Sequence, residues 1–431
     1  MQLKRMAIGA TLANATCGLL GALPAAPVAA QEVSDWEIDT SLLYYAEDND
    51  RVRDASLMTS ARRVFDEDRF FDLSLTVDSL TGATPSGAVP SSQAQTFTSP
   101  SGKDSYVIEP GATPLDGSFL DTRIALSGNW NQSLGDSMRW SAGLSASHEY
   151  DYLHIGVNGR IERDFNKRNT TVYLGAAYGQ DDISPVGGTP IGLAPMLEVD
   201  NQSSKLRDDS KSVVDLLVGA TQVLTRRSVI EVAYSYGLSD GYLNDPYKFL
   251  SVVDRGTGLP VAGPVGSGLN LYLYESRPDS RTKQSLFAEW RYALDRDSLA
   301  LNYRIMNDDW DVTSQTIDAR YHWNFTPNSY LEPHIRYYTQ SAADFYRTVL
   351  FDDEALPAFA SADYRLADLD AYTAGLKYGR RTAHGEFSVR LEYYHQAGDP
   401  SPDASVGDLA NHDLLPPMSA VIAQFGYKFR F

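Results

Sequence analysis

The sequence predicts an all-β fold: a transmembrane, antiparallel, up-and-down β-barrel of about 16 strands, with 14 or 18 strands as alternatives. Three observations carry this prediction. Apolar and polar residues alternate in segments of roughly ten residues, which is the length a tilted strand needs to cross a bilayer. The long connections between these segments all share one parity along the chain. The chain also ends on a strand-like segment with alternating aromatic residues.

The alternation gives each segment one apolar and one polar face, because successive side chains of a strand point to opposite sides. In the segment 136–148, Trp140 and Leu144 fall on one side, while Arg139 and Ser145 fall on the other. Sixteen segments of this kind lie at 37–46, 52–65, 70–79, 120–131, 136–148, 153–163, 170–180, 211–224, 228–239, 281–294, 298–308, 311–325, 330–340, 369–379, 385–395 and 419–431.

The connections between the segments divide by length. Counted from the N-terminus, every connection from an even-numbered segment to the next is short. The long connections all follow odd-numbered segments, at 80–119, 181–210, 240–280, 341–368 and 396–418. In an up-and-down sheet, connections of one parity lie at one end, and outer-membrane barrels have short periplasmic turns and long external loops. A soluble β-sandwich also shows alternation, but it gives no reason for this shared parity.

Residues 1–30 have the pattern of a secretory signal peptide. Lys4 and Arg5 precede an apolar run over residues 7–23, and small residues follow up to residue 30. That run is shorter than the roughly 20 residues that a transmembrane helix needs. We therefore expect cleavage after residue 30 and secretion to the periplasm. One barrel domain would then cover residues 31–431 in the outer membrane of a Gram-negative bacterium.

The composition excludes several classes of function. Asp and Glu number 56 against 37 Lys and Arg, for a net charge of −19. Nucleic acid is therefore not an expected partner, since phosphate binding needs a basic face. Cys17 is the only cysteine and lies in the predicted signal peptide. The mature chain therefore could not form a disulfide or a thiolate metal site, and it could not use a cysteine nucleophile.

The last nine residues, AQFGYKFRF, have the alternation of a membrane strand. Phe425, Tyr427, Phe429 and Phe431 would face lipid and the periplasmic aromatic girdle, with polar residues between them facing the lumen or the head groups. A Phe-terminated last strand resembles the C-terminal signature that the barrel assembly machinery reads in bacterial outer-membrane proteins. The expected partners are therefore this machinery, outer-membrane lipid and lipopolysaccharide.

Two further stretches resemble a known family. Residues 78–88, DSLTGATPSGA, are similar to the first external loop of a family of predicted outer-membrane β-barrel proteins, the domain of unknown function DUF3570. Residues 274–286, YESRPDSRTKQSL, and the aromatic C-terminus are similar to the same family. The resemblance spans most of the mature chain. It implies a barrel in the outer membrane, but it brings no functional residues.

The motifs of metal and nucleotide chemistry do not indicate an enzyme. The sequence has no His-Glu-x-x-His pair, phosphate-cradling loop or dinucleotide fingerprint, and no Ser/His/acid set has motif support. We therefore expect no enzymatic activity and no cofactor. His148 and His154 flank a short turn that contains Glu149 and Asp151, which suggests a metal site. The two histidines fall on opposite strand parities, however, and metal ligands must converge, so we expect no metal there.

Acidic residues cluster near the ends of segments that would carry the long loops. They can be read as solvated loop residues, which charge runs usually are. They could also bind divalent cations that bridge to lipopolysaccharide, or favour the permeation of cations. No loop has the spaced ligand series of an EF-hand. The clusters are Asp48/Asp50, Asp181/Asp182, Asp208/Asp209, Asp308/Asp309/Asp311 and Asp352/Asp353/Glu354.

Charged residues at the polar strand positions predict the character of the barrel interior. Each would cost ~2–4 kcal/mol if it faced lipid near the midplane, so they require a wet or densely salt-bridged lumen. A barrel of about 16 strands is wide enough for an aqueous channel unless loops plug it. The predicted lumen-lining residues are Arg123, Arg139, Arg160, Glu162, Asp215, Glu231, Glu289, Arg291, Arg304, Asp318, Arg320, Glu332, Arg336, Glu386, Arg390 and Glu392.

The function that these features favour is a passive channel or transport pore for small hydrophilic solutes. The loops 80–119 and 240–280 are rich in small residues, Gly and Pro among them, and would narrow its mouth, or else form mobile surface. The alternative is a non-conducting scaffold that holds a periplasmic or surface partner, such as a redox carrier. A homo-oligomer is an open alternative to a monomer.

Overall fold

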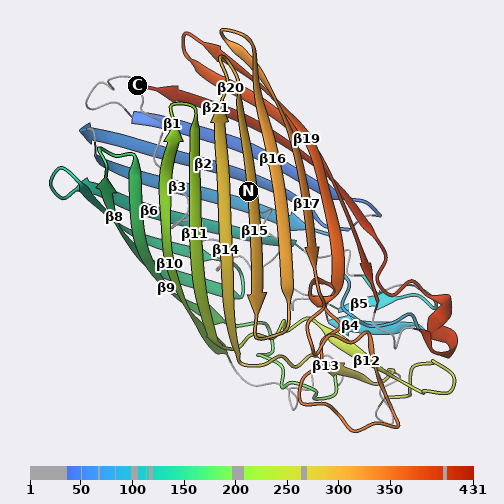
Figure 1. Ribbon diagram of the computed structural model, residues 1–431. Helices are drawn as coiled ribbons and strands as arrows, with labels where there is room; N and C mark the ends of the chain where they lie inside the picture. The colour runs from blue at the N-terminus through green and yellow to red at the C-terminus, as the bar shows by residue number, and fades with distance from the viewer. Residues whose placement is uncertain are drawn as a thin grey trace.

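A closed wall of 16 antiparallel strands forms the body of the protein in the computed structural model (Figure 1). The structure describes residues 36–49, 51–66, 68–82, 84–98, 105–112, 114–115, 120–196, 208–263, 269–400 and 405–431. The predicted signal peptide lies outside the described residues. Among the described residues, no helix is both long and apolar enough to span a membrane.

The strands follow chain order around the wall, and β1 pairs with β21 to close it. The predicted all-β barrel of 16 strands is therefore confirmed. The barrel strands are β1 (Trp36–Glu47), β2 (Arg53–Asp66), β3 (Arg69–Thr81), β6 (Leu120–Ser133), β7 (Met138–His148), β8 (Tyr152–Phe165), β9 (Thr170–Ile183), β10 (Asp209–Thr225), β11 (Ser228–Gly241), β14 (Ser280–Ala293), β15 (Ser298–Asp308), β16 (Thr313–Thr326), β17 (Ser329–Gln340), β19 (Asp368–Thr382), β20 (Gly385–Asp399) and β21 (Met418–Arg430).

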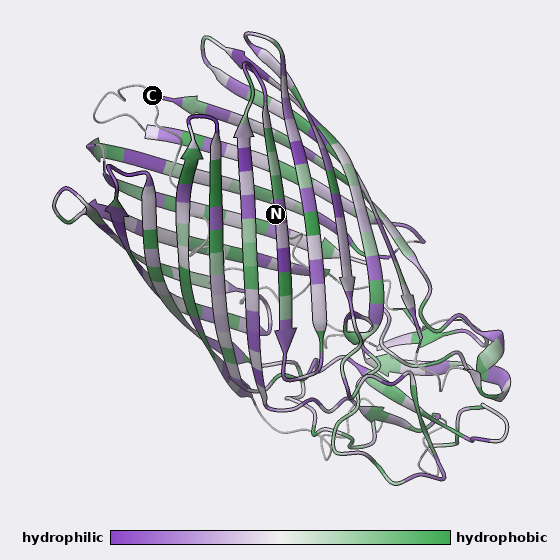
Figure 2. Ribbon diagram, in the orientation of Figure 1, coloured by the Kyte–Doolittle hydropathy of each residue, from purple (hydrophilic) through white to green (hydrophobic). Residues whose placement is uncertain are grey.

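The two faces of the wall differ in chemistry along every strand. Figure 2 shows the hydropathy alternating along the strands. On one face, large apolar side chains are left exposed: Leu144, Ile335 and Leu391 expose 66%, 63% and 58% of their surface. The alternate positions carry polar and charged side chains, many of them buried. A barrel in lipid must have this arrangement, because lipid covers the outward apolar face while the polar face encloses the interior.

The five long connections fold together at one end of the barrel into what we call the loop cap, the described residues of 84–115, 184–208, 242–279, 341–367 and 400–417 (Figure 1). The cap contains a three-stranded sheet in the order β13-β12-β18 and a hairpin of β4 and β5. Short 3-10 helices, η2 (Tyr364–Leu366) and η4 (Gly407–Asn411), complete it. Its strands are β4 (Gln95–Thr98), β5 (Ser105–Ile108), β12 (Phe249–Val253), β13 (Tyr272–Tyr274) and β18 (Val349–Phe351).

The loop cap has apolar cores of its own. Phe97, Phe249 and Tyr272 pack in one cluster, which joins three long connections. Val253 and Phe351 belong to a second cluster, which also includes residues of the 400–417 connection. The interpretation of loops 80–119 and 240–280 as mobile surface is therefore wrong for their described parts, because these segments are folded around buried side chains.

Two tyrosines brace the inward face of the wall by lying across glycines. The ring of Tyr173 on β9 lies over Gly219 on β10, and its hydroxyl donates to Glu231 on β11 over 2.6 Å. On the far side of the barrel, Tyr330 on β17 lies over Gly379 and donates to Glu386 on β20 over 2.8 Å. Only a residue without a Cβ leaves room for the ring, so each glycine permits a tie between strands that are not neighbours.

The C-terminal strand closes the barrel with different contacts on its two faces. The rings of Tyr427 and Phe429 stack with centroids 5.4 Å apart, and Phe431 continues the row. Between these aromatics, Lys428 and Arg430 both form ion pairs with Glu37 on β1. The seam between first and last strands is thus tied by charges on the face opposite the aromatic row.

We predict that Gly219→Ala destabilises the barrel. The added methyl would overlap the Tyr173 ring, so the ring would have to leave the wall and give up its bond to Glu231. Overpacking of this kind costs about 1–3 kcal/mol. The midpoint of urea unfolding in detergent should fall. Gly159→Ala is the matched control, since a Cβ there meets nothing closer than 3.7 Å; equal midpoints for the two variants would contradict this role of Gly219.

Candidate functional site

Residues that lie opposite each other on neighbouring strands have side chains on the same face of the wall, and this holds from strand to strand around the barrel. Arg123 lies opposite Asp78, Glu289 opposite Glu231, and Asp318 opposite Arg336, so members of each pair share a face. Followed strand by strand, this register places all 16 residues of the predicted lumen-lining set on the same face, opposite the exposed apolar side chains.

Most of the charges on the inward face are paired with one another, although Asp215 Oδ2 is buried without a hydrogen-bond partner among the described residues. His334 bridges two carboxylates, with Nε2 at 2.7 Å from Asp318 and Nδ1 at 2.9 Å from Glu392. Buried ions need such partners, because an unpaired charge removed from water is costly. The other pairs on this face include Arg123–Asp78, Arg139–Glu162, Arg139–Asp164, Arg160–Glu162, Arg291–Glu289, Arg320–Asp318, Arg390–Glu332, Arg390–Glu392 and Arg381–Glu386.

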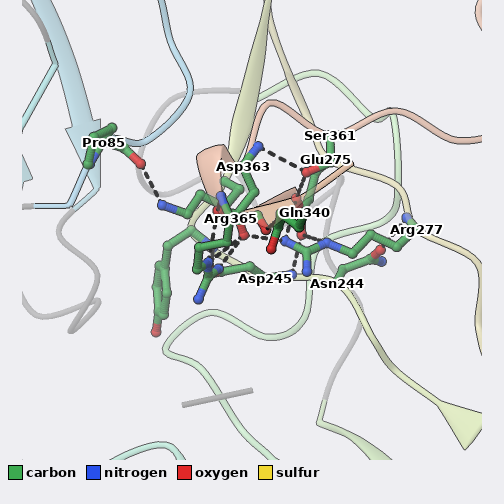
Figure 3. Close-up of polar contacts among 11 residues, drawn as sticks. Pro85, Asn244, Asp245, Glu275, Arg277, Gln340, Ser361, Asp363 and Arg365 are labelled. Atoms are coloured by element: carbon green, nitrogen blue, oxygen red, sulfur yellow. Dashed lines mark hydrogen bonds and ion pairs between the residues drawn. The ribbon is translucent and has the colours of Figure 1, made fainter. Parts of the chain in front are cut away.

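The loop cap contains a second, more deeply buried set of charges, which we call the latch: Asp245, Glu275, Arg277, Asp363 and Arg365 (Figure 3). Arg277 lies 2.7 Å from Glu275 and 2.8 Å from Asp363. Arg365 bonds to Asp363 and, over 2.7 Å, to Asp245. The first three residues come from the connection between β11 and β14, and the last two from that between β17 and β19. The latch therefore joins two loops that are far apart in sequence.

Neighbouring groups tie the latch to the rest of the cap and to the wall. Ser361 Oγ donates to Glu275 over 2.5 Å. Lys248 Nζ donates to the carbonyl of Pro85 over 2.5 Å, which brings in a third long connection. Gln340, the last residue of β17, donates to the carbonyls of Arg365 and Ala367. Three loops and one strand end thus meet at this point.

Burial and charge pairing oppose each other in the latch. Burial by itself raises the pKa of Asp363, but the cations Arg365, Lys248 and Arg277 outweigh it and hold that pKa well below its usual range. Burial raises the pKa of Glu275 and lowers that of Lys248. Removing one partner of such a network leaves an uncompensated buried charge, which costs about 3–5 kcal/mol. The latch therefore holds the loops together only while it is complete.

Two residues of the acidic clusters have buried, paired side chains, whereas most of the other described members are exposed, as the solvated-loop interpretation expects. Asp181 is fully buried and pairs with His154 and Lys211. Asp308 pairs with Arg281. Asp353 and Glu354 both bond to Arg255, in exposed positions. Asp50 lies outside the described residues. Across the part of the chain that the structure describes, no three His, Cys, Asp or Glu side chains converge to hold a metal ion.

The two histidines near the β7–β8 turn lie on opposite faces of the wall. His148 is exposed on the apolar face, whereas His154 is buried on the inward face. Their imidazoles therefore do not share a ligand position.

A Gly-x-Ser-x-Gly string, GLSDG, occurs at residues 237–241. The nucleophile elbow that this string can mark is a turn between a strand and a helix. Here the string lies inside β11, with Ser239 buried in the strand. It is therefore part of the wall and does not form an elbow.

Sequence reasoning missed the cap sheet and the latch. The apolar strings FLSVV and VLF of β12 and β18 are fully buried and parallel to each other, and such short apolar runs inside long connections were the available signal. Glu275 and Arg277 lie within the stretch used for the family resemblance, but nothing local in the sequence identifies Asp363 as their partner.

Comparison with solved structures gives low similarity. The siderophore receptor PirA from Acinetobacter baumannii has a TM-score of 0.42 at 9% identity, over 85% of this chain and 54% of that one. OprB from Pseudomonas putida has a TM-score of 0.41 at 11% identity, over 92% and 94%. OmpT of Vibrio cholerae, lacking one loop, has a TM-score of 0.37 at 10% identity, over 93% and 99%. This chain thus spans about half the length of the siderophore receptors that it matches.

No curated protein matches the sequence. The family comparison is positive: residues 9–429 match the family described as "Protein of unknown function (DUF3570)". This match covers nearly the whole chain and agrees with the resemblance seen in its loops and C-terminus. The chain belongs to the DUF3570 family, and its fold is a closed 16-strand antiparallel β-barrel.

Proposed function

We propose that the protein is an outer-membrane channel for small hydrophilic solutes whose loop-bearing end is narrowed by the loop cap. The observation that carries the proposal is the continuous charged face inside a barrel whose outside exposes leucine and isoleucine. Charges at this density are stable in a membrane only around a polar interior. A 16-strand wall is wide enough to leave an aqueous path.

The outer membrane is the location that best fits this architecture. Bacterial outer-membrane barrels have an even strand count, short turns at one end and long loops at the other, as this chain does. The signal-peptide pattern would deliver the chain to the periplasm. The aromatic row at the end of β21 would be the feature that the assembly machinery recognises, with lipid and lipopolysaccharide around the wall. A second copy of the chain could pack on the same outer face.

The loop cap distinguishes this proposal from a wide, open pore. Its sheet and apolar clusters join segments from all five long connections, and the latch holds two of them together. A solute entering from that end must pass beside or through the cap. We therefore expect a conductance below that of an open barrel of the same strand number.

The sign of the charge near the mouth favours cations. The connection 400–417 has three aspartates and no Lys or Arg, and 341–367 has five acidic residues against two basic ones. Fixed negative charge at a pore mouth raises the local concentration of cations. The same negative charge would attract divalent ions, which could bridge these carboxylates to lipopolysaccharide.

Breaking the latch tests whether the loop cap narrows a channel. Asp363→Ala removes the shared acceptor of Arg277 and Arg365, so the two loops should separate and the cap should open. In planar bilayers we expect a larger single-channel conductance, or more frequent opening, than in the wild type. Arg255→Gln breaks an exposed pair with Asp353 and should leave conductance unchanged. If neither wild type nor Asp363→Ala conducts while both are folded, the channel is ruled out and a non-conducting scaffold becomes the better account.

The carboxylate of Glu149, in the turn between β7 and β8, predicts that the ion selectivity of the channel depends on pH. Burial, followed by the charges of Asp121, Asp151 and Asp78, raises the pKa of Glu149 to about 7, against the opposing effect of Arg123. Glu149 is then neutral at pH 5 and negative at pH 8. The preference for cations, measured as reversal potential in a salt gradient, should increase over this range. Glu149→Gln should lose the increase, and a wild-type selectivity that does not vary from pH 5 to 8 would contradict the assignment.

A further inference from the structure

Three adjacent strands bring a serine, a histidine and an aspartate into one line on the inward face. His154 Nδ1 on β8 lies 2.6 Å from Asp181 Oδ1 on β9. The other ring nitrogen, Nε2, lies 3.4 Å from Ser145 Oγ on β7. This is the order in which a nucleophile, a general base and an orienting carboxylate are arranged in serine hydrolases. Contacts of this kind are often long before substrate binds.

The surroundings of Asp181 fix the tautomer of the histidine. Asp181 is fully buried, and Lys211 Nζ lies 3.4 Å from its second oxygen, so a cation accompanies the carboxylate inside the wall. A carboxylate only accepts hydrogen bonds, so the Nδ1 of His154 must donate to it. In neutral imidazole the lone pair then resides on Nε2, which is the atom facing Ser145.

Two glycines leave the space beside Ser145 and His154 free of other side chains. A Cβ on Gly156 would lie 2.6 Å from Ser145 Oγ and 2.9 Å from His154 Nε2, and one on Gly179 would lie 3.0 Å from the same ring. Ser145 is partly exposed, while His154 and Asp181 beneath it are buried. A substrate in the lumen can therefore approach the hydroxyl, and water does not surround the base.

We propose that Ser145 is a nucleophile for acyl transfer, with His154 as its general base and Asp181 as a positioning residue. The substrate class is a carboxylic ester of a hydrophilic molecule small enough to enter the lumen. Asn158 lies on the same inward face, opposite Gly143 of the strand that carries Ser145, and its side-chain amide is the N–H donor assigned to the oxyanion. This goes beyond the channel function and departs from the expectation that the chain is not an enzyme.

The chemical steps balance without an added cofactor. Ser145 Oγ attacks the carbonyl carbon, and its proton passes to His154 Nε2. The carbon–oxygen bond to the leaving alcohol breaks, and the alkoxide takes that proton from the imidazolium. Water then attacks the acyl carbon while His154 accepts its proton. The bond from that carbon to Ser145 Oγ breaks, and His154 returns a proton to Oγ. The products are an acid and an alcohol.

Labelling of the folded, full-length barrel with a fluorophosphonate tests the nucleophile directly. Attack by Ser145 forms an oxygen–phosphorus bond and expels fluoride, and peptide mass spectrometry locates the adduct. Ser127 is the matched internal control, because it lies opposite Ser145 in register, is more exposed, and has no imidazole bonded to it in the described structure. We expect the adduct on Ser145 and not on Ser127.

Variants separate catalysis from structure. Ser145→Ala should abolish labelling and reduce hydrolysis of a p-nitrophenyl ester by at least about 100-fold, the lower end of what general-base assistance alone contributes. His154→Gln should do the same, while Asp181→Asn should shift the pH profile of labelling. If Ser145 in the wild-type barrel is labelled no more than Ser127, or if hydrolysis survives in Ser145→Ala, the proposal is overturned. Failure of this test would leave the conductance predictions unaffected, since they do not depend on ester cleavage.

Discussion

The closed ladder of backbone hydrogen bonds is the constraint on which the rest of the structure depends. In a bilayer no water is available to bond a free strand edge, so the first and last strands must pair, and β1 and β21 do. Closure also fixes the parity of every side chain, because a slip by one residue in any strand would turn its charges toward lipid. The Glu37 pairs with Lys428 and Arg430 reinforce this register at the seam.

Closing the barrel also creates a large inward surface of polar side chains. This surface must be stabilised without an ordinary apolar core. The barrel meets this need by pairing charges across neighbouring strands and by laying tyrosines over glycines. Apolar packing is concentrated instead in the loop cap, where five connections share clusters such as that of Val253 and Phe351. The wall is thus held by its ladder and ion pairs, while the cap is held by burial and by the latch.

These two parts of the molecule differ in how far the sequence predicts them. Each wall strand is predicted by the alternation of apolar and polar residues within its own segment, such as 136–148. The number of strands, and the face on which each side chain lies, therefore follow from local sequence. The cap depends on contacts between segments far apart in the chain, such as Lys248 with Pro85 and Arg277 with Asp363, and no local pattern encodes them. The Ser145–His154 contact is intermediate, because it follows from parity only once the hairpin register of β7 and β8 is known.

The central claim is that one face of this wall meets lipid and the other meets a polar interior, and two neighbouring residues test it most directly. Leu126 is exposed on the apolar face and Ser127 on the inward face of β6. Single cysteines at these positions, in a chain with Cys17 replaced by alanine, can be probed in liposomes with a charged, water-soluble maleimide. Ser127→Cys should react readily, whereas Leu126→Cys should react only after detergent is added. Equal reactivity at the two positions in liposomes would contradict the account.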